Sequence, residues 1–281
     1  MKIFNNKKDL KDCLLEYKRS KKTIGFVPTM GALHRGHLSL IEEAQRTNNI
    51  VVASIFVNPT QFDNVEDLKK YPKTIENDIK LLASVSCDVL FSPPVEEIYS
   101  KNIVSEKLDF DGLEHQMEGK FRDGHFDGVG TVVKTLFKII EPNSAYFGQK
   151  DFQQLQIIKK MVQKNKLNIN VKGCQIFREK DGLAMSSRNS RLSNKSREVA
   201  PFIYEILEKV KDKLKTKSVA EINDWVENEF KTQKLLKLEY FIIADEKTLK
   251  TTKKRDTGKK YRAFIAVFAG KIRLIDNIRL E

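Results

Sequence analysis

The chain has 281 residues, of which 40% are hydrophobic and 32% are charged, and its formal net charge is +13. This length predicts a large core shared between two lobes, and three widely spaced cysteines without a CxxC pair argue against a disulfide framework or a zinc site. The longest apolar stretch, Ile50–Val57, is too short to span a bilayer, and the first residues lack the apolar run of a secretory signal. We therefore expect a soluble, cytoplasmic protein with no membrane partner.

The basic excess lies mainly in the last part of the chain. Residues 176–281 hold 25 Lys and Arg against 16 Asp and Glu, a net charge of +9, and the earlier residues carry +4. A basic surface can attract nucleic acid or an acidic small substrate. Much of the excess lies on lysine-rich stretches such as Lys209–Lys217, which are typical of a solvated helix face, so we expect no nucleic-acid partner.

The first elements that the sequence predicts are a helix and a buried strand. Apolar residues recur on one face of Lys7–Arg19, which indicates an amphipathic helix. The apolar, β-branched residues from Ile24 onward predict a buried strand that ends at Pro28, because proline cannot donate to the ladder. A tight loop follows, and then a helix whose apolar rhythm begins near Gly36.

This strand, loop and helix together are a candidate anion site. The free N–H groups of such a loop and the positive end of the helix dipole attract anions. His34 and His37 lie three positions apart, so both rings project to one side if the first turn is helical. They suit a phosphate ester better than a metal, because no third ligand with metal spacing is nearby. A surface loop with two chance histidines is the alternative, although the chain has only four histidines in total.

The same residues carry a resemblance to known proteins. His34-Arg35-Gly36-His37 resembles the HxGH signature of the nucleotidyl-transferase superfamily, and the longer string PTMGALHRGH is similar to the pantoate–β-alanine ligase family. Further blocks (FVNPTQF, YPKT, FRDGHFDGV and MSSR) extend the resemblance over nearly the whole chain. It implies ATP-dependent condensation of pantoate with β-alanine through a pantoyl adenylate, with AMP and pyrophosphate released. It also implies Mg²⁺ as a cofactor and a homodimer.

Ile50–Val57 reads as a strand buried on both faces of a parallel sheet. Ligands of open parallel sheets sit at the carboxyl ends of strands, so Asn58 and Gln61 are expected beside the histidine loop. Gln61 offers both a donor and an acceptor, which suits a hydroxylated acid whose carboxylate must stay free to react. The alternative for Gln61 is a turn residue that caps its own loop.

Thr74 is a candidate N-cap for a helix through about Ala83. Asp78, inside that helix, is a candidate contact for a magnesium-bound phosphate, and a solvated helix carboxylate is the alternative. Asp88–Phe91 then reads as another short strand.

The stretch from Pro93 to Gly130 is the least regular part of the chain, and loops of this length in a compact domain tend to be functional. The resemblance places its FRDGHFDGV block at the border of the substrate pocket. Glu118, Arg122 and His125 are therefore candidates, with Arg122 orienting His125 or an anionic partner. A purely structural loop is the alternative for Glu118.

Thr131–Ile140 has a helical apolar period that Pro142 ends. Val132 and Val133 are candidates to line the apolar side of a dimethyl-bearing acid, and the alternative is that they are simply core residues. We therefore expect a helix here, next to the irregular stretch.

Ser144–Gly148 reads as a strand with charged residues at its carboxyl end, where a further helix opens. Lys150 supplies a positive charge for a phosphate chain, Asp151 can accept hydroxyl protons from a ribose, and Gln154 can bind oxygens of the acid. An ordinary charge pattern at a helix N-terminus is the alternative. The family more often has Glu where this chain has Gln149, a change expected to be neutral.

Ile169–Phe177 reads as the last strand of the first lobe, and the small polar residues of Gly182–Asn189 suit a mobile loop. Two hydroxyls and an arginine can grip a triphosphate, and the MSSR block within this loop resembles that of the family. A plain interdomain linker is the alternative. We expect a boundary between residues 1–176, an ATP- and pantoate-binding domain, and residues 177–281, a lid domain.

The second lobe reads as a small α+β domain. The expected helices are Ser196–Lys215 and Val219–Phe230, the second opened by a capping box of Ser218 and Glu221. The expected strands are Leu238–Ala244, Tyr261–Phe268 and Lys271–Asn277, with a hairpin at Gly270. The predicted fold is therefore α/β, a Rossmann-like doubly wound parallel sheet with a smaller C-terminal α+β domain.

Residue chemistry and the resemblance together assign the candidate site. The expected catalytic residues are His34, His37, Lys150 and Arg188. The expected ATP contacts are Pro28, Met30, Gly36, Gly148, Lys150, Asp151, Met185, Ser186, Ser187 and Arg188. The expected pantoate contacts are Thr29, Met30, Gln61, Val132, Val133 and Gln154. The expected β-alanine or pocket-lining residues are Asn58, Tyr71, Glu118, Arg122 and His125, and the candidate metal contact is Asp78.

Two other functions compete with this interpretation. An adenylyltransferase that moves AMP onto a phosphate ester also uses HxGH, but it would need cations where this chain has Gln61 and Gln154. An RNA-binding protein would account for the basic charge, but the chain lacks an anticodon-binding module and interleaved aromatic and basic residues.

Overall fold

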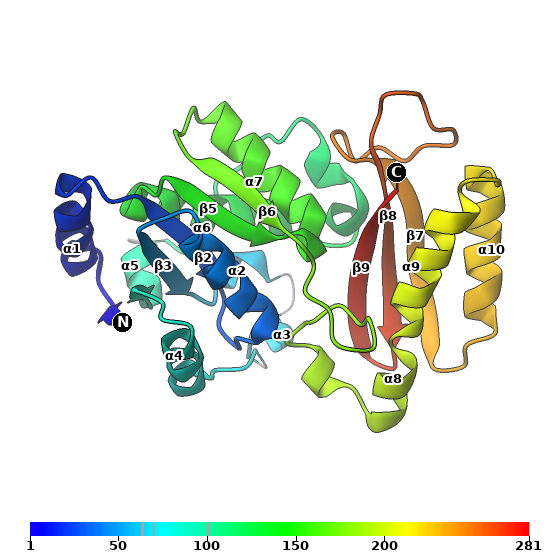
Figure 1. The fold of residues 1–281 in the computed structure, drawn as a ribbon, viewed down its shortest axis with the longest axis horizontal. Coiled ribbons are helices and arrows are strands. Elements are labelled where there is room, and N and C mark those ends of the chain that lie inside the picture. The colour runs from blue at the N-terminus through cyan, green and yellow to red at the C-terminus, as the bar shows by residue number, and fades with distance from the viewer. Residues whose placement is uncertain (63–64, 70, 100–101, 281) are drawn as a thin grey trace. The chain divides into compact units, whose positions relative to one another are not determined.

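The computed structural model describes residues 1–62, 65–69, 71–99 and 102–280, and the chain divides into two units, Met1–Gln175 and Ile176–Glu281 (Figure 1). The described residues of the first unit form a six-stranded parallel sheet in the order β1-β4-β3-β2-β5-β6. The strands are β1 (Lys2–Phe4), β2 (Ile24–Thr29), β3 (Ile50–Ile55), β4 (Val89–Phe91), β5 (Ser144–Gly148) and β6 (Asn170–Cys174). The predicted doubly wound α/β fold is confirmed.

Helices cover both faces of this sheet. Neighbouring residues of a strand point to opposite sides, so the apolar side chains on each side need a helix to pack against. On one side, Val27 packs in a cluster with Ile41 of α2 (Arg35–Gln45) and Leu82 of α4 (Ile75–Ser84). On the other side, Phe26 meets Phe137 of α6 (His125–Ile140), with ring centroids 6.1 Å apart. The inner strands are therefore buried on both faces, as the continuous apolar run of β3 predicts.

Further helices and short 3-10 turns complete the described part of the first unit. The remaining α-helices are α1 (Lys7–Arg19), α3 (Val65–Lys69), α5 (Val95–Ile98) and α7 (Phe152–Lys164). The 3-10 turns are η1 (Pro59–Gln61), η2 (Leu113–His115), η3 (Met117–Lys120) and η4 (Gln149–Asp151). Several of these turns directly follow strands or precede helices, which is where the predicted site residues lie.

Two helices differ from the prediction. The helix expected from Thr131 starts earlier, at His125. Gly128 and Gly130 lie in its first turns and interrupt the apolar pattern, so the sequence did not reveal these turns. The single helix expected over Ser196–Lys215 is two, α8 (Asn194–Val199) and α9 (Phe202–Lys213). Pro201 separates them, because it has no N–H to continue the helical hydrogen bonds.

The second unit contains a three-stranded antiparallel sheet in the order β7-β8-β9 within the residues described. Its strands are β7 (Leu236–Asp245), β8 (Tyr261–Ala269) and β9 (Ile272–Leu280). Gly270 has a φ of +61° in the turn that joins β8 to β9, so the predicted hairpin is confirmed. Apolar residues of α9 and α10 (Val219–Lys231) pack with the strands in one core cluster.

Within the described ranges, no helix combines the length and the apolar character that crossing a bilayer requires.

Candidate active site

The candidate site of the first unit lies where the strand order changes direction. Strands β3 and β4 follow β2 toward one edge of the sheet, and β5 and β6 extend toward the other edge. β2 and β5 are parallel neighbours, so their carboxyl ends lie side by side. The loop that carries His34 follows β2, and the turn that carries Lys150 follows β5. This is the position at which ligands bind in doubly wound sheets.

The rings of the two histidines lie against each other at the start of α2, tilted by 31°. His34 is the N-cap, and the centroid of its ring lies 4.0 Å from that of His37. The backbone N–H of His34 donates to Nδ1 of His37 at 3.3 Å. Because Nδ1 of His37 accepts this bond, the proton of a neutral ring is on Nε2.

The electrostatic surroundings keep His37 neutral. Burial, followed by the neighbouring His34 and Lys150 charges, lowers the pKa of His37 from 6.5 to about 3. At neutral pH, in the absence of ligand, His37 is therefore a neutral N–H donor. The sequence places His37 among the expected catalytic residues but does not reveal its protonation, because the desolvation and the neighbouring charges that lower its pKa come from the fold.

The backbone amides of the loop are not free, contrary to the prediction. Each N–H from residue 31 to residue 34 donates to a side chain of the same unit. The acceptors are, in order, the Thr29 hydroxyl (3.2 Å), the Asp78 carboxylate for two successive amides (3.0 and 2.8 Å) and the His37 ring (3.3 Å). An anion at this site must therefore rely on side chains more than on these four amides.

Asp78 is a structural carboxylate. It is 1% exposed, and its oxygens accept hydrogen bonds from the amides of Ala32 and Leu33 and from the hydroxyl of Thr74. The alternative of a solvated helix carboxylate is wrong, because the side chain is buried. The bonds also occupy both oxygens, which argues against a contact with a magnesium-bound phosphate. Among the described residues, no group of three or more His, Cys, Asp or Glu side chains is arranged to hold a metal.

Gln61 is held against the histidine loop. Its Nε2 lies 2.7 Å from Sδ of Met30, and its Oε1 accepts a hydrogen bond from Nδ2 of Asn58 at 3.2 Å. Capping of the turn falls to Asn58, which is 1% exposed and whose side chain accepts from the amide of Thr60. The structure thus brings together three predicted residues, from the ends of β2 and β3.

His125 and Arg122 form hydrogen bonds that hold the backbone at Gln61. Nδ1 of His125 lies 2.8 Å from the carbonyl oxygen of Gln61, and its Nε2 lies 3.1 Å from Nη1 of Arg122. Arginine can only donate, so Nε2 accepts and Nδ1 carries the proton given to Gln61. Arg122 does orient His125, and both ring nitrogens of His125 are used within the protein. The pair thus positions Gln61, and the role of lining a β-alanine site stays a prediction.

Two further residues of this region had no strong signal in the sequence. A Cβ on Gly128 would lie 2.5 Å from the carbonyl oxygen of Thr60, so only glycine lets α6 approach the Gln61 turn this closely. Gln153 is 4% exposed and donates to two carbonyls of the 113–116 segment, while its Oε1 accepts from the amide of Glu118. In the sequence, only its position next to Gln154 pointed to a role for Gln153 in this region.

The residues after β5 lie partly open. Lys150 is 17% and Asp151 51% exposed, and their charged atoms are 3.9 Å apart. A Cβ on Gly148 would meet no atom within 4 Å, so open space lies beside the end of β5. Gln154 lies in the first turn of α7 and is partly buried.

The other predicted residues of the first unit have structural surroundings. Val132 and Val133 are each 5% exposed within α6, which agrees with a core role. The ring of Tyr71 packs edge-on against Phe62, with centroids 5.7 Å apart. Pro28 is paired with Ser54 in the sheet. Ligand contacts for these residues stay predictions.

In the second unit, the predicted lid loop begins as a tight hairpin. Leu183 and Ala184 are buried, and the amide of Met185 donates to the carbonyl of Phe177. Arg178 donates to the carbonyl of Gly182, which has a φ of +90°. The first half of the loop is therefore anchored within its unit.

The second half of the loop carries the predicted phosphate contacts. Ser186 and Ser187 are partly buried, and Arg188 is exposed. The hydroxyl of Ser186 accepts from the amide of Arg188 at 3.2 Å, which curls the segment into a turn. Asn189 is anchored as well, because its side-chain amide donates to Glu179 at 2.7 Å and to the carbonyl of Ala184 at 3.1 Å, so freedom to move is expected only for residues 186–188.

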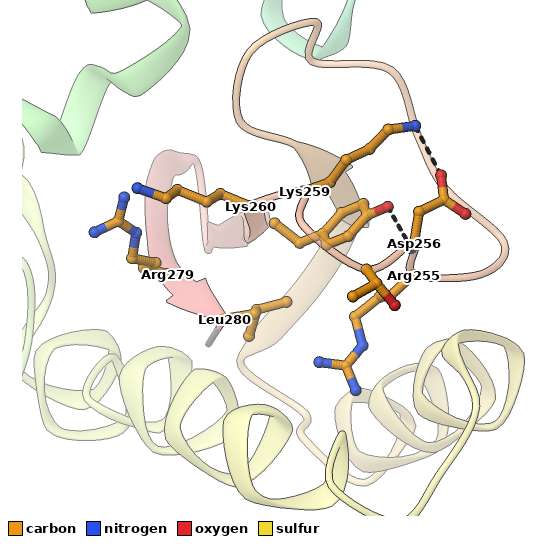
Figure 2. Close-up of a pocket in the computed structure, with 8 residues that line it drawn as sticks. Arg255, Asp256, Lys259, Lys260, Arg279 and Leu280 are labelled. Atoms are coloured by element: carbon orange, nitrogen blue, oxygen red, sulfur yellow. Dashed lines mark hydrogen bonds and ion pairs between the residues drawn. The ribbon is translucent and has the colours of Figure 1, made fainter.

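A separate basic hollow of about 540 Å³ lies in the second unit between the ends of β8 and β9 (Figure 2). Two of its cations have acidic partners: Lys259 pairs with Asp256 at 2.7 Å, and Arg279 pairs with Glu246 at 3.1 Å. Figure 2 shows Lys259 reaching Asp256 across the loop between β7 and β8. This hollow contains none of the predicted site residues.

Comparison with known proteins gives consistent results. The family model described as pantoate-beta-alanine ligase matches residues 2–279. A pantothenate synthetase of Flavobacterium psychrophilum is 54% identical over 282 residues, covering 100% of both chains. The crystal structure of pantothenate synthetase from Thermus thermophilus has a TM-score of 0.91, 39% identity and 99% coverage of both chains. A pantoate-beta-alanine ligase from Francisella tularensis, complexed with beta-gamma ATP and beta-alanine, has a TM-score of 0.81 and 37% identity, covering 99% of this chain and 97% of its own.

Proposed function

The chain belongs to the pantoate–β-alanine ligase family, and from this premise we propose that it joins pantoate to β-alanine through a pantoyl adenylate, with ATP converted to AMP and pyrophosphate. The observation that carries the proposal is the contact of Gln61 with Met30, 2.7 Å from amide to sulfur. It sets a neutral amide, rather than a cation, beside the HxGH loop. A neutral amide suits the hydroxyls of an organic acid, whereas a phosphate-ester substrate would require positive charge.

The ligands of one relative support the same substrates. The crystal structure of the Francisella tularensis ligase is of its complex with beta-gamma ATP and beta-alanine. We propose that ATP, with Mg²⁺ carried on its phosphates as part of the substrate, binds between the histidine loop and the Lys150 turn of this chain. Pantoate then lies beside Gln61 and Gln154, and β-alanine enters on the side of the Glu118 segment.

The chemistry proceeds in two displacements. The pantoate carboxylate forms a bond to the α-phosphorus as the bond to pyrophosphate breaks. The amine of β-alanine then bonds to the carbonyl carbon, AMP leaves with the electron pair of the broken C–O bond, and the amine loses a proton. No protein nucleophile is needed, because the carboxylate is already anionic and the adenylate already activated. Catalysis rests on alignment and on donors aimed at the phosphates, namely His34, His37, Lys150 and Arg188.

The direct test measures pyrophosphate release from ATP. With pantoate alone, we expect a single turnover of pyrophosphate that stops when the adenylate occupies the site. Addition of β-alanine should then give continuous release of pyrophosphate and AMP. No pyrophosphate before β-alanine is added would contradict an adenylate intermediate, and release with a phosphate ester in place of pantoate would favour an adenylyltransferase.

Gln61 and Gln154 supply a test of the pantoate site. We expect Gln61→Ala and Gln154→Ala each to weaken pantoate binding by about 1–3 kcal/mol and to change ATP binding much less, because a buried hydroxyl would lose its partner. Calorimetric titration of each ligand measures both effects. Gln45→Ala is the matched control, because the Gln45 amide donates to the carbonyl of Val85 instead of to a ligand. Equal losses for pantoate and ATP would contradict the assignment.

We also propose that the second unit acts as the lid of this reaction, with residues 186–188 as its mobile segment, and that the protein is a homodimer. Hydrogen exchange across the segment should slow when ATP and Mg²⁺ bind, because Ser186, Ser187 and Arg188 then bond phosphate oxygens. The buried Leu183 and Ala184 serve as the internal reference, since their exchange should change little.

Arg188→Ala should slow adenylation and let more adenylate hydrolyse before β-alanine arrives, since closure excludes water. The measurement is the ratio of free pantoate to pantothenate formed from preloaded adenylate. Unchanged exchange protection at saturating nucleotide would show that the segment is a rigid linker.

A further inference from the structure

In the loop before the histidines, backbone amides bind the carboxylate of Asp78, a group of the same protein. The amides of Ala32 and Leu33 point at a carboxylate that is 1% exposed, at 3.0 and 2.8 Å. Two successive amides aimed at one negative group are the arrangement with which many loops hold a phosphate. Here the negative group belongs to α4, 45 residues beyond Leu33 along the chain. The loop is therefore organised before any ligand arrives.

The loop needs such a partner because its backbone is unusual. Gly31 has a φ of +79°, and Ala32 has a φ of +49°, which residues other than glycine seldom adopt. Residues persist in such conformations only when their surroundings hold them there. Both bonds to Asp78 start inside or directly after this pair. A Cβ on Gly31 would lie 3.0 Å from Oδ2 of Asp78 and 3.1 Å from Ile55, so glycine also makes room for the carboxylate.

The carboxylate is itself held in place. The hydroxyl of Thr74, the N-cap of α4, donates to Oδ2 of Asp78 at 3.1 Å, and the backbone amide of Asp78 donates to the carbonyl of Thr74 at 2.9 Å. Leu33, which donates the second loop bond, is 7% exposed and packs in the core cluster below α2. The next residue is His34. A shift of Asp78 would therefore be transmitted directly to the histidine pair.

We infer that Asp78 is a positioning residue for adenylation, which sets the direction of His34 and His37 by fixing the two amides before them. It touches the loop and no reacting atom. This inference rests on the proposed function, because it assigns the histidines to the phosphates of ATP. It differs from a metal-binding role, since both carboxylate oxygens are used within the protein.

Asp88 is the matched control. Its Oδ2 also accepts a backbone N–H, that of Val51 at 2.8 Å, so it makes the same kind of bond in the same unit. Val51 lies near the amino end of β3, whereas the histidine loop follows the carboxyl end of β2. Loss of the Asp88 carboxylate should therefore remove a backbone hydrogen bond of the same kind without misdirecting the histidines.

The experiment compares Asp78→Asn with Asp88→Asn. Asp78→Asn keeps the shape of the side chain but turns a donor toward one loop amide. We expect its kcat for pyrophosphate formation to fall about 10-fold to 100-fold, with the KM for pantoate changed by less than about 3-fold, because a small misplacement of catalytic groups costs rate. Asp88→Asn should keep a kcat within about 3-fold of wild type. An unchanged kcat in folded Asp78→Asn, or an equal loss in both variants, would overturn the inference.

Two further measurements separate this inference from the proposed function. Exchange of the Ala32 and Leu33 amides should quicken in Asp78→Asn and stay slow in Asp88→Asn, and this result does not depend on activity. If wild type released no pyrophosphate with pantoate, the proposed function would fail. The exchange measurement would still test whether Asp78 anchors the loop. In Asp78→Ala, formate at a concentration that again protects both amides should restore part of the lost rate. No gain in rate under that protection would overturn the positioning role.

Discussion

We expect His37→Ala and His34→Ala each to form pyrophosphate from ATP and pantoate about a hundredfold more slowly than wild type, the usual cost of losing one preorganised donor to a developing charge. The rate of a single turnover, measured by rapid quench, gives the effect on adenylation directly. Folding should survive, because both residues lie at the start of α2 and neither is a member of the core cluster that α2 forms with the sheet. His115→Ala is the control, since His115 is exposed and lies in η2. Near-normal adenylation by both alanine variants would remove the histidines from the mechanism.

The pKa of His37 makes this prediction more specific. Because burial lowers that pKa to about 3, the ring in the free enzyme is neutral above this value and acts through its Nε2–H. The kcat/KM for ATP should therefore show no loss from deprotonation of His37 between about pH 6 and 8. His37→Gln keeps an N–H donor and should recover part of the rate that His37→Ala loses. A loss of kcat/KM as the pH rises through about 6.5 in wild type, absent in His37→Gln, would show instead that His37 works as a cation.

The second large effect concerns the stability of the second unit. Nη1 and Nη2 of Arg178 donate to the two carboxylate oxygens of Asp276 at 2.6 and 3.0 Å, and the Asp276 side chain is 4% exposed. Arg178→Ala leaves this buried carboxylate without its main partner. We expect the free energy of unfolding of the unit to fall by about 3 kcal/mol, the scale for breaking a buried pair from one side. The chain has a single tryptophan, Trp225 in α10, so its fluorescence during urea unfolding reports on this unit.

The control for this prediction is an exposed ion pair of the same unit. Lys259 and Asp256 are 57% and 58% exposed, so Lys259→Ala should change the stability of the unit far less than Arg178→Ala, because water screens an exposed pair. Arg178 also stacks on Tyr204, 3.6 Å from the ring centroid, and donates to Gly182 at the start of the lid hairpin. Its loss should therefore quicken hydrogen exchange at Leu183 as well. A cost no larger than that of the Lys259 variant would show that Asp276 finds other partners.

The local elements followed from the sequence because their signals are local. The β-branched run before Pro28, the histidine spacing and the Ser218–Glu221 capping box each lie within a few residues, and the structure has β2, α2 and α10 at these places. The hairpin at Gly270 depends on one residue that tolerates positive φ. The alternation of strands and helices likewise indicated a doubly wound sheet, which is confirmed.

Tertiary structure decided how these elements serve the site. The N–H groups of the histidine loop look free in the sequence, and they are bonded because Asp78, far along the chain, meets Ala32 and Leu33. The early start of α6 was hidden by glycines, and Gly128 is needed only because α6 crosses the Gln61 turn.

The protonation of His37 also depends on neighbours that the fold brings to it, Lys150 among them. The sequence by itself therefore determined the family, the kinds of element and the residue types that gather at the ends of β2, β3 and β5. Only the packed structure decided which donors remain available, because hydrogen bonds and desolvation act over a few ångströms in space whatever the separation along the chain.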